Sequence, residues 1–411
     1  MVDPVTLGFS IAAIIIFIGF AGDVIFRKTG IPPILFLLLV GVIIGPVFGF
    51  VPTSLITPLL PLFATLTLIM VLFYGGMTMR IRALLSNSGR TAAQVSIYVI
   101  SSTVIIAYLL SYFLGWPLIE ALIFGSIVGG ETSGAVVVPL AMSMGFKESP
   151  KSFIMLESAL NSVLTAVLFI SFVTIYQIGT GININNAVNS LVSTFSTGIV
   201  VGLVVSLFWI FILHNLNRHR HIYVLTLGLL LITYSISEAL GGSGIFSVLI
   251  FGVVLGNFKL FTIIFKKKVR ILGVKERLFE FQGEMTFLLT TFFFVFLGLL
   301  FNISYSNLMY TLIFGGLTLL ILLGARALAV NVSTYKSQLS KDKTSIFLMC
   351  AQGVTPLVLM SLAIVDGVQL ASQFIPLVTF VIISTNLITI VGAVLRKRGI
   401  VRGSGVSSRL F

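Results

Sequence analysis

The feature that most constrains the fold of this chain is an apolar run that recurs along its whole length. Runs of about twenty residues are long enough to cross the ~30 Å hydrocarbon core of a membrane as an α-helix. Strands of a membrane barrel would be about half as long and would alternate in polarity. Because no long polar stretch separates the runs, the sequence predicts an all-α polytopic membrane protein without a soluble domain.

Composition supports this class. Only 9% of the 411 residues are charged and 57% are hydrophobic, whereas a soluble protein carries roughly a quarter charged residues. No basic residue precedes the first run, so we interpret it as a retained helix and not as a cleaved signal peptide. We predict about 13 helices, at approximately 5–25, 31–49, 54–79, 91–114, 117–144, 151–176, 186–214, 221–239, 243–258, 277–303, 306–334, 343–365 and 372–395.

The basic residues are sorted between the predicted loops. Every second connection carries them, from Arg27 and Lys28 to a short basic tail at 396–411, and the other connections carry none. The positive-inside rule therefore predicts an N-terminus outside and a C-terminus in the cytoplasm. All but one of the 25 basic residues lie in such loops, the exception being Arg326. The net charge of +13 thus indicates topology and contact with anionic lipid, not nucleic-acid binding.

The chain also repeats weakly, with an offset of seven helices. Helix 2, PPILFLLLVGVIIGP, resembles helix 9, SGIFSVLIFGVVLGN, and helices 3 and 10 share a Phe-x-Gly pattern. The matched positions are Gly41 with Gly252, Gly45 with Gly256, Phe73 with Phe296 and Gly75 with Gly298. An odd offset predicts inverted repeats, as in secondary transporters. The alternative is a chance match between glycine-spaced apolar helices.

The same offset pairs two interrupted helices. Helix 5 contains GGETSGAVVVP, with Gly129 and Gly130, and helix 12 contains AQGVTP, with Gly353 and Pro356. Discontinuous helices at matching places of two repeats indicate a binding site near the membrane midplane, because unwound backbone supplies polar groups there. The alternative is a pair of kinks without function.

Few charges lie deep in the predicted helices. They are Glu131 in helix 5, Glu157 in helix 6 and Arg326 in helix 11. Each costs ~3 kcal/mol or more in the membrane, so Arg326 should hold one carboxylate through a bidentate contact. The other carboxylate would then be free to bind a proton or a cation. The carboxylates near helix ends, which we expect to be solvated, are Asp23, Glu120 and Glu238.

Five helices together resemble the monovalent cation:proton antiporters, in the sodium/proton exchanger branch, over nearly the whole chain. The motifs are GIPPILFLLLVGVIIGP, ESALNS, GSGIFSVLIFGVVLGN, TFFFVFLGLL and GARALAV. The resemblance implies one membrane transporter domain over 1–411, in which a six-helix transport core with crossed helices 5 and 12 is interleaved with a dimerisation subdomain. It also implies a homodimer in the plasma membrane and alternating access.

Helix 6 departs from the family pattern. The family motif usually reads Glu-Ser-x-x-Asn-Asp, and its Asp binds cation and proton in turn. Glu157, Ser158 and Asn161 match this motif, but Ser162 stands at the Asp position. A serine cannot carry a proton at physiological pH or balance the charge of a cation. The resemblance also makes Glu157 the partner of Arg326 in a structural ion pair.

Helix 5 offers a replacement carboxylate. Where the family break usually reads Thr-Asp-Pro, this chain has Glu131, Thr132 and Ser133. We therefore predict that Glu131 binds the cation and the proton, with neutral oxygens from Thr132, Ser158, Asn161 and Ser162. A dehydrated cation needs several oxygen ligands, of which at least one should be anionic. The alternative is that Glu131 only caps the second half-helix.

The predicted function is exchange of a monovalent cation (Na⁺, K⁺ or Li⁺) for protons, without a cofactor or a metal other than the transported cation. One alternative is a degenerate family member that acts as a sensor or an uncoupled facilitator. Another is an organic-anion carrier, which the net negative core charge disfavours. The three His lie within 214–221, and neither a His-Glu-x-x-His nor a Gly-x-Gly-Asp motif is present, so we do not expect an enzyme.

Overall fold

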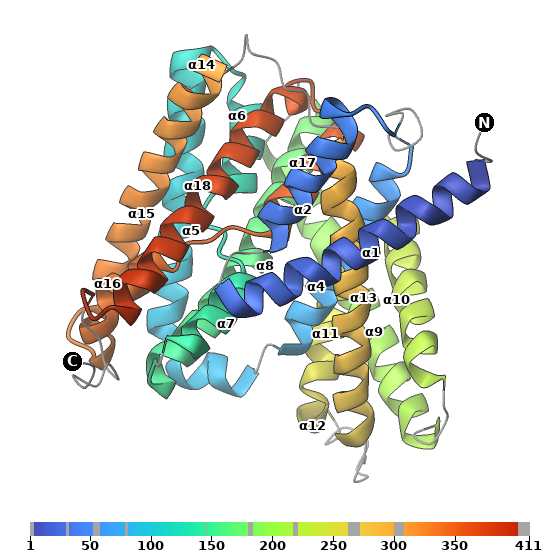
Figure 1. Ribbon diagram of the computed structural model, residues 1–411. Helices are drawn as coiled ribbons and strands as arrows, with labels where there is room; N and C mark the ends of the chain where they lie inside the picture. The colour runs from blue at the N-terminus through green and yellow to red at the C-terminus, as the bar shows by residue number, and fades with distance from the viewer. Residues whose placement is uncertain are drawn as a thin grey trace. The chain divides into compact units, whose positions relative to one another are not determined.

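The computed structural model describes residues 4–29, 33–51, 58–78, 81–144, 146–179, 184–216, 221–261, 272–299 and 308–401. Within these ranges every regular element is helical and none is a strand (Figure 1). Among the described residues, eight helices are long and apolar enough to cross a membrane, and five shorter apolar helices accompany them. The predicted all-α membrane fold is confirmed, while the number of membrane crossings stays a prediction.

The chain divides into two compact units, and four helices run through the division: α4 (Leu60–Thr78), α5 (Ile81–Leu114), α8 (Glu148–Ile178) and α13 (Leu272–Leu299). The first unit comprises Met1–Thr65, Gly89–Val173 and Leu288–Phe411, and the second comprises Leu66–Ser88 and Thr174–Phe287. Their correspondence to transport and dimerisation subdomains stays a prediction.

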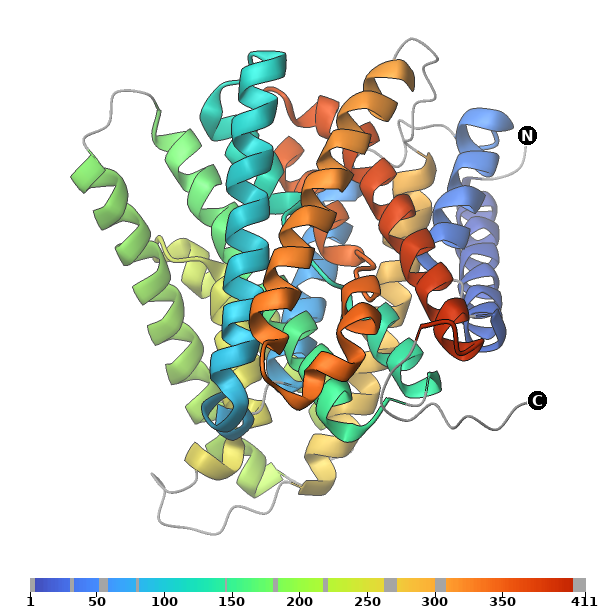
Figure 2. The same ribbon diagram turned by 90° about the vertical axis from the view of Figure 1, so that its left-hand side faces the viewer.

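Most of the remaining elements belong to the first unit, and their order along the chain can be followed by colour in Figures 1 and 2. They are α1 (Pro4–Thr29), α2 (Pro33–Val42), η1 (Ile43–Val47), α6 (Leu118–Val128), α7 (Gly134–Ser143), α14 (Leu308–Tyr310), η3 (Thr311–Gly315), α15 (Gly316–Thr334), η4 (Gln338–Asp342), α16 (Lys343–Leu348), α17 (Val354–Val365) and α18 (Ala371–Lys397). Helix α18 packs against α15, α16, α17 and α6. Three aromatic rings pack against one another in this unit, with centroids 5.2–5.7 Å apart: Trp116 meets Phe124 edge to face, and Phe374 is tilted against both.

The second unit is built around α11 (Gly244–Gly256), which packs against α9 (Ile184–Leu216) and α10 (Ile222–Ala239). The short α12 (Phe258–Phe261) follows it. Buried side chains of α4, α9 and α11, among them Phe73, Trp209 and Phe251, form its hydrophobic core. The Trp209 indole also donates a hydrogen bond to the Thr226 hydroxyl at 3.1 Å, so the buried polar end of this ring is satisfied.

Both interrupted helices are broken as the sequence predicts. Helix 5 consists of α6 and α7, joined by the non-helical residues 129–133, and helix 12 consists of α16 and α17, joined by 349–353. Gly130 has φ +70°, and a Cβ there would lie 2.7 Å from the Val99 Cα. Both the left-handed backbone and the close packing therefore require glycine at this position.

Close helix contacts in the first unit depend on two glycines. A Cβ on Gly41 of α2 would collide with the carbonyl oxygen of Val295 in α13, and a Cβ on Gly298 would collide with the carbonyl oxygen of Leu38. The two backbones therefore touch, because neither glycine has a side chain.

The second unit contains the same contact between α11 and α4. A Cβ on Gly252 would collide with the carbonyl oxygen of Phe73, and a Cβ on Gly76 would lie 2.6 Å from that of Leu249. Because two helix pairs that share the same weak sequence similarity also pack in the same way, the structure is consistent with the predicted repeat.

The packing corrects the register of that repeat. Gly76, not Gly75, occupies the place that Gly298 has in the first unit, and Phe73 matches Val295, not Phe296. The sequence alignment is therefore one residue out of register in these two helices. The reason is physical: the aligned Phe-x-Gly pattern does not mark the glycine whose missing side chain permits the contact.

Two acidic or basic residues expected in water are buried. Glu120 is 3% exposed, and its Oε2 accepts the Leu370 N–H at the start of α18, at 2.8 Å. Arg396, predicted to begin the basic tail, lies inside α18 and is 1% exposed. Its Nη1 lies 2.9 Å from Asp342 Oδ1, which removes the need for solvent. Residues 402–411 of the predicted tail and loop residues 262–271 lie outside the described residues.

Candidate cation and proton site

The two helix breaks lie against each other. The Ser133 N–H donates to the Ala351 carbonyl oxygen at 2.8 Å, and the Gly353 N–H donates to Glu131 Oε2 at 3.1 Å. The two contacts are reciprocal: in each break the residue that donates lies two positions after the residue that accepts. In one direction the acceptor is a backbone carbonyl, and in the other it is the Glu131 carboxylate. The helix 5 break thus presents a carboxyl group to the helix 12 break.

The Glu131 side chain is 1% exposed, and its two oxygens differ. Oε2 accepts the N–H of Gly353, which is the N-cap residue of α17. The partial positive charge of this helix N-terminus favours an anion there. Oε1 faces α8, where the Ser162 hydroxyl lies 3.5 Å away. The Thr355 hydroxyl also interacts with the carboxylate. Glu131 therefore meets the half-helix of the other break.

The other predicted ligands come from α8 and the helix 5 break. Asn161 Nδ2 donates to Thr132 Oγ1 at 3.1 Å, and both side chains are fully buried. The Ser158 hydroxyl donates within its own helix, to the Met155 carbonyl oxygen. Asn161 Oδ1 has no partner among the described residues. The structure thus gathers Thr132, Asn161 and Ser162 near Glu131, while Ser158 faces the start of α7, where a Cβ on Gly134 would lie 3.0 Å from its hydroxyl.

The predicted helix-break residues separate into two kinds. Gly129, Gly130 and Gly353 lie in the non-helical segments. Pro356 instead lies in the first turn of α17. A proline is tolerated there because the first N–H groups of a helix have no partner within the helix. It therefore starts the second half-helix and does not interrupt the first.

Arg326 and Glu157 form the expected ion pair at full burial. Nη1 lies 2.9 Å from Glu157 Oε1, which also accepts the Gln94 amide at 3.0 Å. The contact is not the bidentate one expected from the sequence. Glu157 Oε2 has no partner among the described residues. The Ser333 hydroxyl donates to Gln94 Oε1 at 2.8 Å and holds that amide in place.

The remaining donors of Arg326 bind the end of a half-helix. Nε donates to the Phe347 carbonyl oxygen at 2.8 Å, and Nη2 donates to those of Ile346 and Met349 at 2.8 and 2.6 Å. These carbonyls belong to the C-terminus of α16, which carries partial negative charge. Arg326 therefore caps α16, a role that the spacing of charges in the sequence did not indicate.

Two polar residues of helices 12 and 13 lie at the helix 12 break, although neither is among the ligands expected from the sequence. Gln352 Nε2 donates to the Val128 carbonyl oxygen at the end of α6, at 2.6 Å. Asn386 Nδ2 donates to the Gln352 carbonyl oxygen at 2.8 Å, which places Asn386 against the helix 12 break as Asn161 is placed against the helix 5 break. The available signal was a fully polar amide, Gln352, within an otherwise apolar segment.

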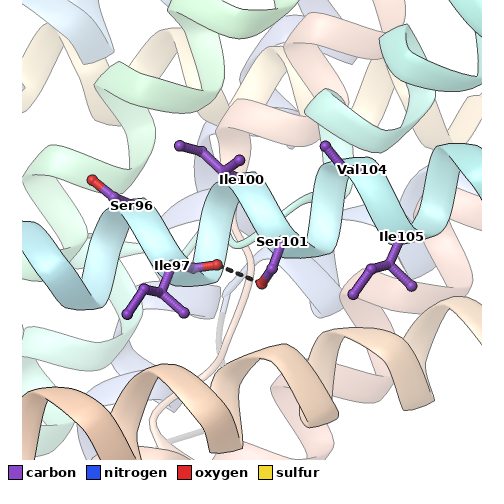
Figure 3. Close-up of a pocket in the computed structure, with 6 residues that line it drawn as sticks. All are labelled: Ser96, Ile97, Ile100, Ser101, Val104 and Ile105. Atoms are coloured by element: carbon purple, nitrogen blue, oxygen red, sulfur yellow. Dashed lines mark hydrogen bonds between the residues drawn. The ribbon is translucent and has the colours of Figure 1, made fainter.

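A shallow hollow on the surface of α5 is not suited to an ion. Figure 3 shows its lining, which comes from one helix: Ser96, Ile97, Ile100, Ser101, Val104 and Ile105. The Ser101 hydroxyl is bonded to the Ile97 carbonyl of the same helix. Gln94 and Tyr98, on another face of α5, contact Glu157 and Arg326. Only that second face of α5 belongs to the polar site.

Comparison with known families matches residues 11–397 to the transmembrane sodium/hydrogen exchanger family. This chain belongs to that family. It is therefore a multi-pass membrane protein of a transporter family, as the sequence resemblance predicts.

Individual relatives are more distant. The chain is 26% identical over 401 residues to the K(+)/H(+) antiporter NhaP2 of Shewanella sp. (strain ANA-3), covering 94% of this chain and 66% of the relative. It is 30% identical over 218 residues to the Na(+)/H(+) antiporter ApNhaP of Aphanothece halophytica, covering 53% and 42%. The chain thus spans less than two thirds of the length of these relatives.

The fold of this chain also matches that of a solved structure. The sodium proton antiporter MjNhaP1 from Methanocaldococcus jannaschii, determined at pH 8, matches with a TM-score of 0.75 and 22% identity, over 96% of this chain and 97% of that one. This similarity establishes the fold over the matched 96% of the chain.

Proposed function

We propose that this exchanger-family protein moves a monovalent cation against protons by alternating access, and that Glu131 binds the two in turn. The observation that carries the proposal is the 3.5 Å distance between the Ser162 hydroxyl and Glu131 Oε1. Position 162 is where the resembled family has its exchanging Asp. A carboxylate from the helix 5 break therefore reaches the place where the usual carboxylate is missing.

The chemistry of the two buried glutamates separates their roles. Glu157 accepts hydrogen bonds from Arg326 and Gln94 on one oxygen, and its charge is balanced by the guanidinium. Glu131 accepts the Gly353 N–H on one oxygen, and its other contacts among the described residues are with the hydroxyls of Ser162 and Thr355. A carboxylate without a cationic partner in a low-dielectric site must bind either a proton or a cation. That competition couples the two fluxes.

Neutral oxygens complete the cation's coordination in this proposal. We infer that the hydroxyls of Thr132 and Ser162 and the amide of Asn161 supply them on the α8 side of the carboxylate, and that the Ser158 hydroxyl, at the start of α7, supplies a fourth. Alkali cations are bound by several oxygen ligands, and one anionic ligand balances a single charge. The named relatives include both K⁺ and Na⁺ antiporters, so the proposed substrate class is a monovalent alkali cation. We place the protein in the plasma membrane as a homodimer, with the N-terminus outside.

The test is cation-driven proton flux in proteoliposomes that contain the purified full chain. A gradient of Na⁺ or K⁺ should change the internal pH, read with a trapped pH-sensitive dye, and Glu131→Gln should abolish the change. Ser96→Ala, in the surface hollow of α5, is the matched control and should transport as the parent does. Full exchange by Glu131→Gln would refute the assignment, and cation flux without proton movement would favour an uncoupled facilitator.

A further inference from the structure

Two bare amide oxygens lie beside the helix 12 break. Gln352 Oε1 and Asn386 Oδ1 belong to side chains with 0% exposure, and neither oxygen has a hydrogen-bond partner among the described residues. Buried acceptors of this kind are almost always paired with a donor, a water or a cation. The two therefore mark a place where a ligand is to be expected.

The orientation of both amides is settled by their neighbours. The Gln352 NH₂ group donates to the Val128 carbonyl oxygen, and the Asn386 NH₂ group donates to the carbonyl oxygens of Gln352 and Ile382, both at 2.8 Å. Backbone carbonyls only accept, so turning either amide over would set oxygen against oxygen. The bare atoms are therefore oxygens and not N–H groups.

The residues that carry these oxygens are linked to the proposed exchange group through the backbone of the helix 12 break. Gln352 directly precedes Gly353, whose N–H holds Glu131 Oε2 at 3.1 Å, and Asn386 is bonded to the main chain of Gln352 itself. The Gln352 side chain reaches the C-terminus of α6, three residues before Glu131 in the chain. One carboxylate and two neutral oxygens are thus anchored on residues 352 and 353.

The ends of the two first half-helices are capped differently. The C-terminus of α16 is bound by the Arg326 guanidinium through three carbonyls, which balances its partial negative charge. The C-terminus of α6 is bound at Val128 by the neutral Gln352 amide. A cation is therefore repelled at the end of α16 and attracted at the end of α6, where Gln352 and Glu131 lie.

We propose that Gln352 and Asn386 supply neutral oxygen ligands to the transported cation, on the side of Glu131 that faces helix 12. The inference rests on the proposed function of Glu131 and extends its site from α8 to helices 12 and 13. Because the added ligands are uncharged, the site has one anionic ligand. A single negative charge suits an alkali cation better than a divalent one, which needs more carboxylates.

The experiment measures cation binding without transport. The purified full chain in detergent is titrated with NaCl, KCl and LiCl at constant ionic strength, against N-methylglucamine chloride, and binding is read from thermal stabilisation. Asn386→Leu and Gln352→Met should weaken cation binding about tenfold, the loss expected for one polar ligand. Gln352→Lys should abolish it, because its ammonium can still donate to the Val128 carbonyl while occupying the site.

The matched control is Thr389→Val. Thr389 lies on α18 like Asn386 and bonds the same break, accepting the Cys350 N–H at 3.1 Å and donating to the Leu348 carbonyl oxygen at 3.0 Å, but its hydroxyl is already paired. Thr389→Val should therefore bind cations as the parent does. If it weakens binding as much as Asn386→Leu, distortion of the break explains the loss and the proposal is overturned.

Two further outcomes separate this proposal from the function on which it rests. Cation affinity within twofold of the parent in all three variants would mean that the oxygens hold only a structural water, and would overturn the inference even if Glu131→Gln abolishes exchange. Binding that survives Glu131→Gln but is lost in Asn386→Leu would support the oxygen ligands and refute the role of Glu131. A parent chain that binds no cation would overturn both.

Discussion

Arg326 holds Glu157 through one nitrogen, with 2.9 Å between Nη1 and Oε1. Its Nε and Nη2 donate to the carbonyl oxygens of residues 346, 347 and 349. The residue therefore joins α8 to the C-terminus of α16. A guanidinium has five N–H donors in a planar fork, so it can serve both partners at once. The ion pair fixes the helix 12 break as well as balancing a charge.

Removing the two partners should therefore have unequal effects. Glu157→Gln should lower the free energy of unfolding by about 3 kcal/mol, because one buried charge loses its partner. Arg326→Met should cost more, because it strands the Glu157 charge and also leaves three carbonyls of α16 without donors. Denaturant titration of the purified protein, followed by circular dichroism, measures both.

The double variant Glu157→Leu with Arg326→Met separates the two contributions. This variant carries neither buried charge, but α16 still lacks its cap. Its stability should therefore recover only in part and should stay below that of the parent. Recovery to the parent value would show that the cap contributes nothing. Single variants as stable as the parent would show that the pair itself is absent.

Moving the carboxylate should restore exchange. In a Glu131→Gln background, Ser162→Asp places a carboxylate at the position where the resembled family has one, next to the amide that replaces Glu131. Cation-driven proton flux in proteoliposomes should return to a measurable fraction of the parent rate. Ser171→Asp in the same background is the control, because Ser171 lies on the same helix more than two turns from position 162 and its hydroxyl donates to the Val167 carbonyl oxygen. A folded Glu131→Gln, Ser162→Asp protein without flux would contradict the shared position of the two acids.

The parts of this site that the sequence predicts are those that carry charge. A buried Glu131, Glu157 or Arg326 is conspicuous in an apolar helix because each costs several kcal/mol in lipid. The contacts of Arg326 with backbone carbonyls left no trace in the sequence, since every residue has a carbonyl. Gln352 gives a weaker signal than these charges, because a neutral amide costs less to bury than an ionised group.

The burial of charged residues near helix ends could not be predicted from the sequence either. Glu120 and Arg396 lie where a hydropathy pattern places them in water, and only tertiary packing supplies their partners, the Leu370 N–H and Asp342. Helix register has the same origin. The choice between Gly75 and Gly76 depends on which glycine faces the neighbouring helix, and two adjacent glycines give the pattern no means to decide.

The buried pair of Arg396 and Asp342 should stabilise the end of α18. Arg396 also donates to the Ser345 hydroxyl at 2.6 Å, and its guanidinium lies 3.8 Å from the Phe146 ring centroid. Asp342→Asn should lower the free energy of unfolding by roughly 3–5 kcal/mol, because the guanidinium loses its anion. Lys341→Ala, at the exposed neighbouring position, should change it by less than about 0.5 kcal/mol. Equal stabilities in the same denaturant titration would exclude a stabilising pair.

Membrane orientation can be tested with single cysteines. The only native cysteine, Cys350, is 1% exposed, so Cys350→Ala provides a background without a reactive thiol. Gln177, Lys259 and Gln338 are exposed in the structure and suit replacement by cysteine. The sorting of basic residues predicts Gln177 outside and the other two in the cytoplasm.

In intact cells a membrane-impermeant maleimide should therefore label Gln177→Cys and should leave Lys259→Cys and Gln338→Cys unmodified until the membrane is permeabilised. The pattern also tests the helix count. Five predicted helices separate positions 177 and 338, and an odd number must place them on opposite sides. Two separate 259 and 338, which must then share a side. Labelling of Lys259→Cys from outside while Gln338→Cys stays protected would contradict the count between them. Complete reversal of the pattern would keep the count and invert the orientation.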